Sequence, residues 1–278
     1  MVVSRETLAG LRVALPRLKS DDAIAAALKT AGAQVDTFAL TQTIPIESEQ
    51  LEQMRQRLAS GYYAWVVLSS WRAAQAVLPQ LNALALAPAS APTLNPPTSA
   101  PTRLAVVGQS TAEWVNSHCA LKPTLVGAGS AAKLLEVFPT PPAATTAAAS
   151  TAATPTICLP QSQLAAPTLA QGLSQLGWQV DAIATYTTVP LPQLPAHLKT
   201  QWQAGAWDAV VVTAGSSAQA LLQLLGPPPK KTAVVSIGKS TTARCRELGL
   251  RVDATAATPR AEHITQAIIN LFKAKDFS

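Results

Sequence analysis

One pattern occurs twice in this chain and constrains its fold more than any other feature. The apolar run 104–107 leads into Gly108-Gln-Ser-Thr111, and the apolar run 233–237 leads into Gly238-Lys-Ser-Thr241. A further helical segment is expected 22 residues after each glycine. Apolar strands that end in glycine- and hydroxyl-rich turns before a helix are typical of α/β folds, which bind anions and polar ligands there. The sequence therefore predicts two similar α/β units in one chain.

The length and the hydropathy pattern agree with two soluble domains. A single core stops growing near about 250–300 residues, and this chain has 278. No run of about 18 apolar residues is present that would span a bilayer. The first residues lack the basic and apolar regions of a secretory signal. We therefore expect a protein without membrane association, in the cytoplasm or, in a photosynthetic eukaryote, in the plastid stroma.

Cysteine, histidine and charge give little support for metal or nucleic-acid binding. The three cysteines and three histidines lie far apart and form no ligand cluster, so buried free thiols are expected and no metal site. The formal net charge is +6, with lysine and arginine scattered along the chain. This excess fits a polyanionic small molecule better than nucleic acid, which favours clustered basic and aromatic residues.

Short β-rich apolar runs alternate with Ala- and Leu-rich helical patterns, which predicts parallel sheets covered by helices. Strands are expected at 11–15, 34–38, 64–68, 103–107, 124–126, 156–159, 179–188, 209–213, 233–237 and 252–254, and helices at 21–31, 49–59, 72–81, 111–119, 131–138, 167–176, 216–225, 241–248 and 261–273. Two segments rich in Ala, Pro and Thr, 87–102 and 139–155, lack large apolar side chains and are expected to be flexible surface loops.

Hydroxyl-bearing side chains follow four of the expected strands. Hydroxyls and free amides at a helix start can hold an anionic group, and a nearby arginine can pair with a carboxylate. Any one of these residues could simply cap its helix. Four such strand ends together favour a ligand site, composed of Ser69, Ser70 and Arg72; Ser110 and Thr111; Thr213, Ser216 and Ser217; and Ser240 and Thr241.

Tyr186 stands at the end of an apolar strand, and its phenol could donate a proton or a hydrogen bond to a ligand. A half-buried packing role is the alternative for a lone tyrosine. The chain has no Ser/His/Asp order, no closely spaced carboxylate pair and no glycine-rich nucleotide loop. Nucleophilic catalysis and NAD chemistry are therefore poorly supported.

Taken together, these segments resemble the uroporphyrinogen-III synthase family. The order and spacing of the segments carry the resemblance, which covers most of the chain outside the two Ala/Pro/Thr-rich segments. The matching pieces are Val13-Ala-Leu-Pro16-Arg17, Val66-Val-Leu-Ser69-Ser70-Trp-Arg72, Val106-Val-Gly108-Gln-Ser-Thr111, Ile157-Cys-Leu-Pro160, Leu173-Ser-Gln-Leu-Gly177, Tyr186-Thr-Thr-Val189, Asp208-Ala-Val-Val-Val-Thr213, Ile237-Gly238-Lys-Ser-Thr241, Glu247-Leu-Gly249 and Ala257-Thr-Pro259.

The resemblance implies an architecture. It is α/β, with two flavodoxin-like parallel-sheet domains joined by a two-stranded linker and the active site in the inter-domain cleft. The first domain would be discontinuous, residues 1–39 with 188–278, and the second would span 46–181. Residues 40–45 and 182–187 would be the linker strands.

The resemblance also implies a reaction. Such enzymes are lyases that need no cofactor: they dehydrate the linear tetrapyrrole hydroxymethylbilane and close the macrocycle with ring D inverted, giving uroporphyrinogen III for haem, chlorophyll and corrin biosynthesis. The substrate also cyclises unaided to the uninverted isomer, so the protein would act mainly by holding one conformation. A monomer is expected, because the cleft would be complete within one chain.

Residue by residue, the resemblance assigns Tyr186 to departure of the hydroxyl group and Arg17 to the basic position after the first strand. The hydroxyl and Arg72 positions above fall on the family's cleft-lining turns. Two positions depart from the family's usual pattern, Ala214 in place of a serine and Gln161 in place of an arginine.

Two other classes of function remain open at this point. A non-catalytic two-lobed binding or regulatory protein would share the architecture, since fold does not determine function. Tyr186 and the four hydroxyl-bearing strand ends favour the enzyme. A glycosyltransferase or nucleotide-sugar enzyme would need an acidic residue for a ribose and a sugar-activating carboxylate, and neither is evident.

Overall fold

The computed structural model describes residues 7–86, 101–142 and 155–276. Most of the two segments predicted to be flexible loops, 87–102 and 139–155, lies outside these described residues. Within the described parts, no helix is long and apolar enough to cross a membrane.

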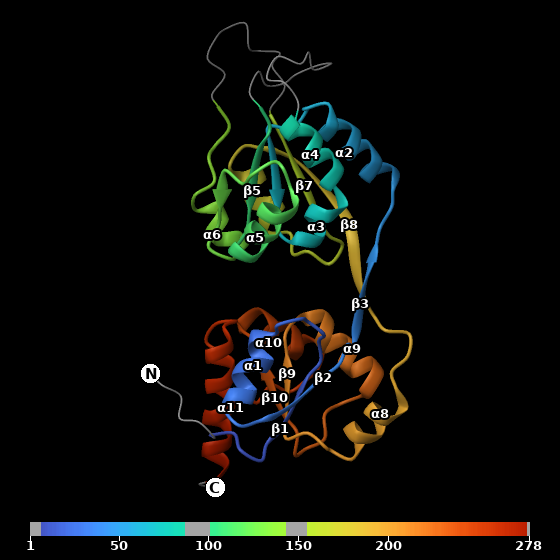
Figure 1. Ribbon diagram of the computed structural model, residues 1–278, viewed down its shortest axis with the longest axis vertical. Helices are drawn as coiled ribbons and strands as arrows, with labels where there is room; N and C mark the ends of the chain where they lie inside the picture. The colour runs from blue at the N-terminus through green and yellow to red at the C-terminus, as the bar shows by residue number, and fades with distance from the viewer. Residues whose placement is uncertain (1–6, 87–100, 143–154, 277–278) are drawn as a thin grey trace, which may run out of the picture. The chain divides into compact units, whose positions relative to one another are not determined.

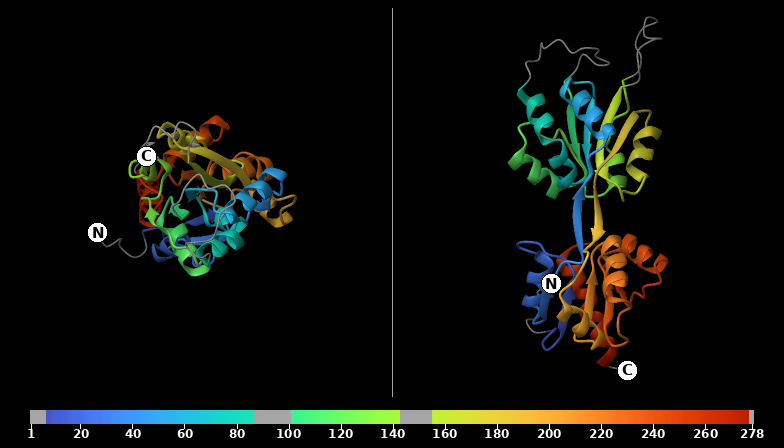
Figure 2. Two further views of the ribbon diagram at one scale, coloured as in Figure 1. Left: turned by 90° about the horizontal axis from the view of Figure 1, so that it is seen from above. Right: turned by 90° about the vertical axis from the view of Figure 1, so that its right-hand side faces the viewer.

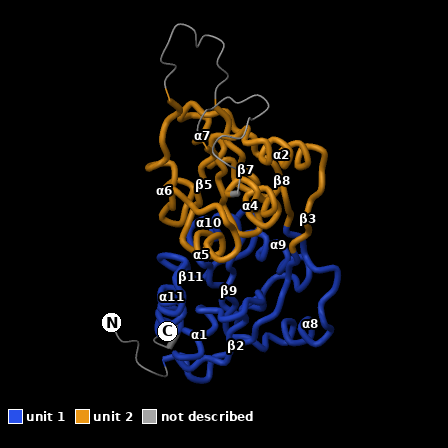
Figure 3. The backbone as a smooth tube through the Cα atoms, turned by 45° about the horizontal axis from the view of Figure 1, so that its top comes forward, with its two compact units in different colours: residues 1–42, 188–278 blue, residues 43–187 orange. Residues whose placement is uncertain are grey.

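The chain divides into two compact units (Figure 3). Unit 1 comprises residues 1–42 and 188–278, and unit 2 comprises residues 43–187. The chain therefore passes from one unit to the other twice, once within β3 (Thr41–Pro45) and once within β8 (Gln179–Pro190).

Unit 1 contains a parallel five-stranded sheet in the order β11-β10-β9-β1-β2. When the strands are numbered within the unit, this is the flavodoxin-like order 2-1-3-4-5. The strands are β1 (Arg12–Leu15), β2 (Gln34–Thr37), β9 (Ala209–Val212), β10 (Ala233–Ser236) and β11 (Ala254–Thr255).

Helices cover both faces of the unit 1 sheet, because alternate strand residues point to opposite faces. Val13 and Leu15 pack with α1 and α11, whereas Ala14 packs with α8, α9 and α10 (Figures 1 and 2). The helices are α1 (Ala23–Thr30), α8 (Ala196–Gln203), α9 (Gly215–Leu225), α10 (Lys239–Glu247) and α11 (Ala261–Asp276).

Unit 2 contains a six-stranded sheet in the order β3-β8-β7-β4-β5-β6. The strands from β8 to β6 are parallel. The Ile46 amide donates a hydrogen bond to the Thr185 carbonyl, and the Leu191 amide donates one to the Leu40 carbonyl. This pattern shows that β3 and β8 are antiparallel. The remaining strands are β4 (Trp65–Leu68), β5 (Arg103–Val106), β6 (Leu125–Val126) and β7 (Thr156–Ser162).

The parallel part of unit 2 is a circular permutation of unit 1. If β7 is counted first, β8 second and β4 third, the order is again 2-1-3-4-5. The segment β7-α7-β8 then corresponds to β1-α1-β2, although it comes last in its unit. Gly177 after α7 and Gly32 after α1 support this equivalence, since both have φ of 97° at the helix end.

Helices α2 to α5 pack on one face of the unit 2 sheet, and α6 and α7 pack on the other (Figure 2). The helices are α2 (Glu49–Ala59), α3 (Trp71–Ala76), α4 (Leu78–Leu86), α5 (Gln109–His118), α6 (Ala131–Leu135) and α7 (Thr168–Gln175).

The structure corrects two of the predicted helices and adds one that was not predicted. The predicted helix 72–81 is two helices, because the backbone breaks at Val77, the C-cap of α3. The predicted helix 131–138 ends earlier, with α6 at Leu135. Helix α8 was not predicted, since its sequence is mostly polar and only Leu198 and Trp202 are buried.

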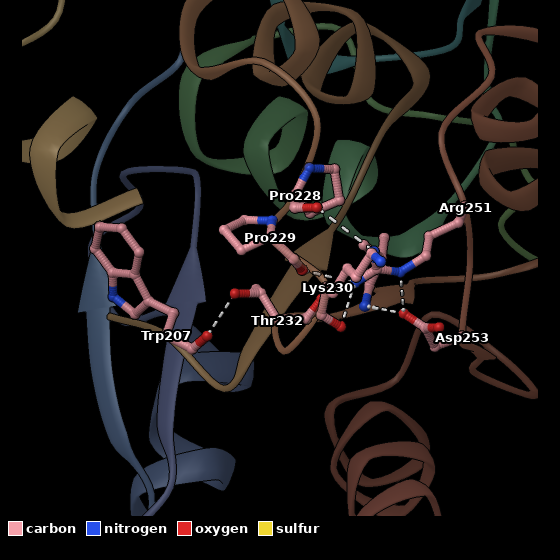
Figure 4. Close-up of polar contacts among 8 residues, drawn as sticks. Trp207, Pro228, Pro229, Lys230, Thr232, Arg251 and Asp253 are labelled. Atoms are coloured by element: carbon pink, nitrogen blue, oxygen red, sulfur yellow. Dashed lines mark hydrogen bonds and ion pairs between the residues drawn. The ribbon is translucent and has the colours of Figure 1, made fainter. Parts of the chain in front are cut away.

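An arginine holds the loop before β10 at the amino end of the unit 1 sheet (Figure 4). The Arg251 guanidinium donates hydrogen bonds to the backbone carbonyls of Pro229 at 2.9 Å, Lys230 at 3.3 Å and Thr232. Its Nε donates to Asp253 at 3.2 Å. Because this cluster lies at the opposite end of β10 from the Gly238 turn, its role is structural.

Candidate functional site

Unit 2 contains a pocket of about 650 Å³ beside Thr185 and Tyr186 of β8. Every residue that lines it belongs to unit 2, on β3, α2, α3, α4, β8 or a connecting segment. These helices lie beside β8 in Figure 1. The volume is in the range of about 300–1,000 Å³ that is usual for small-molecule sites.

Tyr186 lines this pocket and contacts Ser70, so the structure brings these two predicted site residues together. The Tyr186 phenol oxygen lies 3.0 Å from Ser70 Oγ. In the sheet, β7 separates β8 from β4, so the phenol reaches across the carboxyl end of β7. A register shift between Gln161 and Ser162 places Ser162 opposite Tyr186, where the pairing of β7 with β8 ends.

Ser70 is also the N-cap of α3. Its Oγ accepts a hydrogen bond from the Ala73 amide at 3.2 Å. A serine hydroxyl has one hydrogen to donate and two lone pairs to accept with. Ser70 can therefore cap the helix and still donate its hydrogen to Tyr186, which leaves the phenol hydrogen for a ligand.

The two arginines of the pocket differ in whether they are free to bind a ligand. Arg55 is engaged by Glu47 at 2.7 Å and also donates to the Ala76 carbonyl at 3.2 Å. Hydrogen bonding to Arg55 lowers the pKa of Glu47 below its ordinary value. Arg72 lies exposed over the Trp71 ring, 4.5 Å from its centroid. Within the described residues it forms no ion pair, so it remains available to a ligand carboxylate.

The other predicted residues of unit 2 lie outside the pocket. Ser69 and Ser110 are exposed at the carboxyl ends of β4 and β5, and Thr111 is buried in the first turn of α5. Gly108 is the N-cap of α5 and provides no side-chain cap, so the first amides of this helix have no such partner.

In unit 1, the predicted residues gather at the carboxyl ends of β9 and β10. Thr213 and Ser216 are half-buried, Ser217 and Thr241 are buried, and Ser240 is exposed. The N-caps of α9 and α10 are Ala214 and Gly238, neither of which forms a side-chain cap bond. These helix starts therefore present backbone amides, the groups that bind anions at helix N-termini.

Arg17 follows β1, but its guanidinium is held by a carboxylate of the same loop. It donates two hydrogen bonds of 2.6 Å to Asp22, which is also the N-cap of α1 and accepts from the Ile24 amide at 2.9 Å. Burial alone would raise the pKa of Asp22, but the hydrogen bonds and charge of Arg17 lower it. The ion pair fixes the start of α1 and occupies the arginine.

Sequence reasoning missed most of the lining residues of the pocket, including Glu47, Glu52, Arg55, Trp71 and Gln80. They occur in an amphipathic helix and near a helix start, where such residues are usually solvated. No local motif distinguishes them. Among the described residues, no group of three or more His, Cys, Asp or Glu side chains is placed to hold a metal ion.

Comparisons with known proteins agree on one family. No curated protein sequence matches the chain significantly. The family model for uroporphyrinogen-III synthase HemD matches residues 22–266. A mutant uroporphyrinogen III synthase from the extremely thermophilic bacterium Thermus thermophilus is 18% identical with a TM-score of 0.58, over 95% of this chain and 100% of that one. A uroporphyrinogen-III synthetase from Helicobacter pylori is 14% identical with a TM-score of 0.57, over 94% and 99%.

The two solved structures share the two-domain α/β fold of this chain. The family model spans most of the sequence, from the N-cap of α1 into α11, and includes every candidate residue except Arg17. The chain belongs to the uroporphyrinogen-III synthase family.

Proposed function

We propose that Tyr186 and Ser70 form the part of the active site where the hydroxyl group leaves the substrate. The chain is an enzyme of the uroporphyrinogen-III synthase family, a lyase of tetrapyrrole biosynthesis. Its reaction dehydrates hydroxymethylbilane and closes the ring with ring D inverted. The observation that carries the proposal is the 3.0 Å contact between the two hydroxyls at the edge of the unit 2 pocket.

The proposed chemistry requires one proton to be delivered to the oxygen of the leaving hydroxyl group. When the carbon–oxygen bond of the hydroxymethyl group breaks, the phenol of Tyr186 gives its proton to the departing oxygen, which leaves as water. Ser70 donates its own hydrogen to the phenolate and so stabilises the charge that develops there. No strong nucleophile or cofactor takes part in this step.

The remaining residues are assigned to holding the substrate's carboxylates. Arg72 in unit 2 is free of ion pairs within the described residues. The starts of α5, α9 and α10, which have no side-chain cap, present free backbone amides. The hydroxyl-bearing residues proposed to bind carboxylates are Ser69, Ser110, Thr111, Thr213, Ser216, Ser217, Ser240 and Thr241. Arg17 retains a role in fixing its loop.

The domain bounds stay a prediction: residues 1–39 with 188–278, residues 46–181, and linkers 40–45 and 182–187. The cleft expected from the family, a monomeric state and a location in the cytoplasm or plastid stroma stay predictions. No observation favours a non-catalytic role.

The test is the product isomer. Freshly prepared hydroxymethylbilane is mixed with the protein, and the oxidised products are separated into isomers I and III by chromatography. We expect isomer III in excess with the wild-type chain and a smaller excess with Tyr186→Phe. Formation of isomer I alone, at the uncatalysed rate, would contradict the proposed function.

A further inference from the structure

One residue that lines the unit 2 pocket, the half-buried Gln80, has a side-chain oxygen without a hydrogen-bond partner. The Oε1 of Gln80, on α4, is buried and is the one such unpartnered side-chain oxygen or nitrogen in the part of the chain that the structure describes. Gln80 lines the same pocket as Tyr186. A buried unpaired acceptor destabilises a fold, and in a pocket it indicates a donor that a ligand supplies.

The charges of the pocket indicate what kind of ligand group fits there. Two carboxylates, Glu47 and Glu52, balance two guanidinium groups, Arg55 and Arg72. Because Arg55 is engaged by Glu47, only Arg72 is left for an acidic side chain of the ligand. A pocket without net charge does not collect several carboxylates. It suits a single ring that brings an N–H donor and few acidic groups.

We infer that Gln80 binds the pyrrole ring that carries the hydroxymethyl group, by accepting a hydrogen bond from the ring N–H. This inference rests on the proposed function, since Tyr186 lies on the wall of the same pocket and would act on the hydroxyl of that ring. The exposed Trp71 side chain also lines the pocket.

The role of Gln80 follows from the movement of charge during dehydration. The electron pair of the breaking carbon–oxygen bond leaves with the oxygen, which takes the proton of Tyr186 and departs as water. The ring nitrogen shares its lone pair with the methylene carbon, keeps its hydrogen and becomes positively charged. When the other terminal pyrrole attacks that carbon, the positive charge passes to the attacking ring. That ring then loses a proton to the phenolate, which neutralises the product and restores the phenol.

An acceptor that faces this N–H binds the cation more strongly than the neutral substrate. Gln80 should therefore raise kcat more than it lowers KM. The unpaired Oε1 of Gln80 would lower the stability of the free protein, because it gains a hydrogen-bond donor only when the ring is bound.

The test compares Gln80→Leu, Gln80→Glu and the control Gln53→Leu, an exposed residue of α2 outside the pocket. For Gln80→Leu we expect kcat to fall about 10- to 100-fold, as for loss of a hydrogen bond to a charged group. KM should change little, and Tm should stay or rise because the unpaired acceptor is gone. Gln80→Glu keeps an acceptor oxygen and should retain most of the activity. Gln53→Leu should leave kcat unchanged.

The outcomes separate the two claims. If the wild-type chain forms no excess of isomer III, the proposed function fails. If it does, and Gln80→Leu keeps its kcat, the inference about Gln80 is wrong while the function stands. A lowered Tm for Gln80→Leu, with an equal loss of activity in Gln80→Glu, would show a structural role and would also overturn the inference.

Discussion

The hydroxyl of Thr242 lies 2.5 Å from that of Ser236 and 2.7 Å from that of Thr255. Thr242 lies on the helix α10, Ser236 on the strand β10 and Thr255 on the strand β11. The buried hydroxyl of Thr242 therefore connects all three elements. Thr241, one residue earlier, makes neither bond and stands in the first turn of α10.

Substitutions of these two neighbouring residues should have different effects, one on stability and the other on activity. We expect Thr242→Val to lower the free energy of unfolding by about 1–3 kcal/mol, since the buried hydroxyl of Ser236 and the hydroxyl of Thr255 lose a partner. Thr241→Val should leave Tm nearly unchanged and lower the rate of isomer III formation. Thermal unfolding and single-turnover kinetics of both variants provide the check. Equal activities in two equally stable variants would remove Thr241 from the site.

Tyr186→Phe should lower kcat by about 100-fold or more, because it removes the proposed proton donor. Unfolding should be little affected, since the phenol bonds only to Ser70 among the described residues. Ser70→Ala should also slow the reaction and should cost about 1 kcal/mol of stability through loss of the α3 cap. An unchanged rate in Tyr186→Phe would exclude the phenol from the mechanism.

Asp22 predicts a pH dependence of stability. Arg17 lowers its pKa in the folded protein, so its contribution is fully present above the unfolded pKa of about 3.9 and is lost as the pH falls through the lower folded value. Asp22→Asn should therefore be less stable than the wild type at pH 7, and the difference should shrink below about pH 4. Chemical denaturation across this range measures it, and a constant difference would contradict the assignment.

Arg251→Lys should destabilise unit 1, because a lysine cannot reproduce the planar set of donors that contacts four carbonyls and Asp253. A loss of about 1–3 kcal/mol is expected, because the carbonyl of the buried Thr232 loses its guanidinium donor. Arg246→Lys, an exposed position on α10, is the matched control. Similar midpoints for both variants in thermal unfolding would show that the loop before β10 does not depend on Arg251.

The sequence by itself determined the fold class and the family. Strands of β-branched residues that alternate with Ala- and Leu-rich helices predict parallel α/β sheets, and this prediction is confirmed. The repeated Gly-x-x-Thr turns identify α5 and α10 as equivalent helices, both of which begin directly after the glycine. Such information is local, because periodicity and turn residues act over a few positions.

Only the tertiary structure decided which polar groups are available. Arg17 and Arg72 look alike in the sequence, yet the structure engages one with Asp22 and leaves the other exposed over Trp71. Ser70 meets Tyr186 across 116 positions of the chain because β8 and β4 flank β7. Gln80 has no motif, and its unpaired oxygen is defined by its burial. Pairing and burial depend on residues distant in the chain, so no local pattern specifies them.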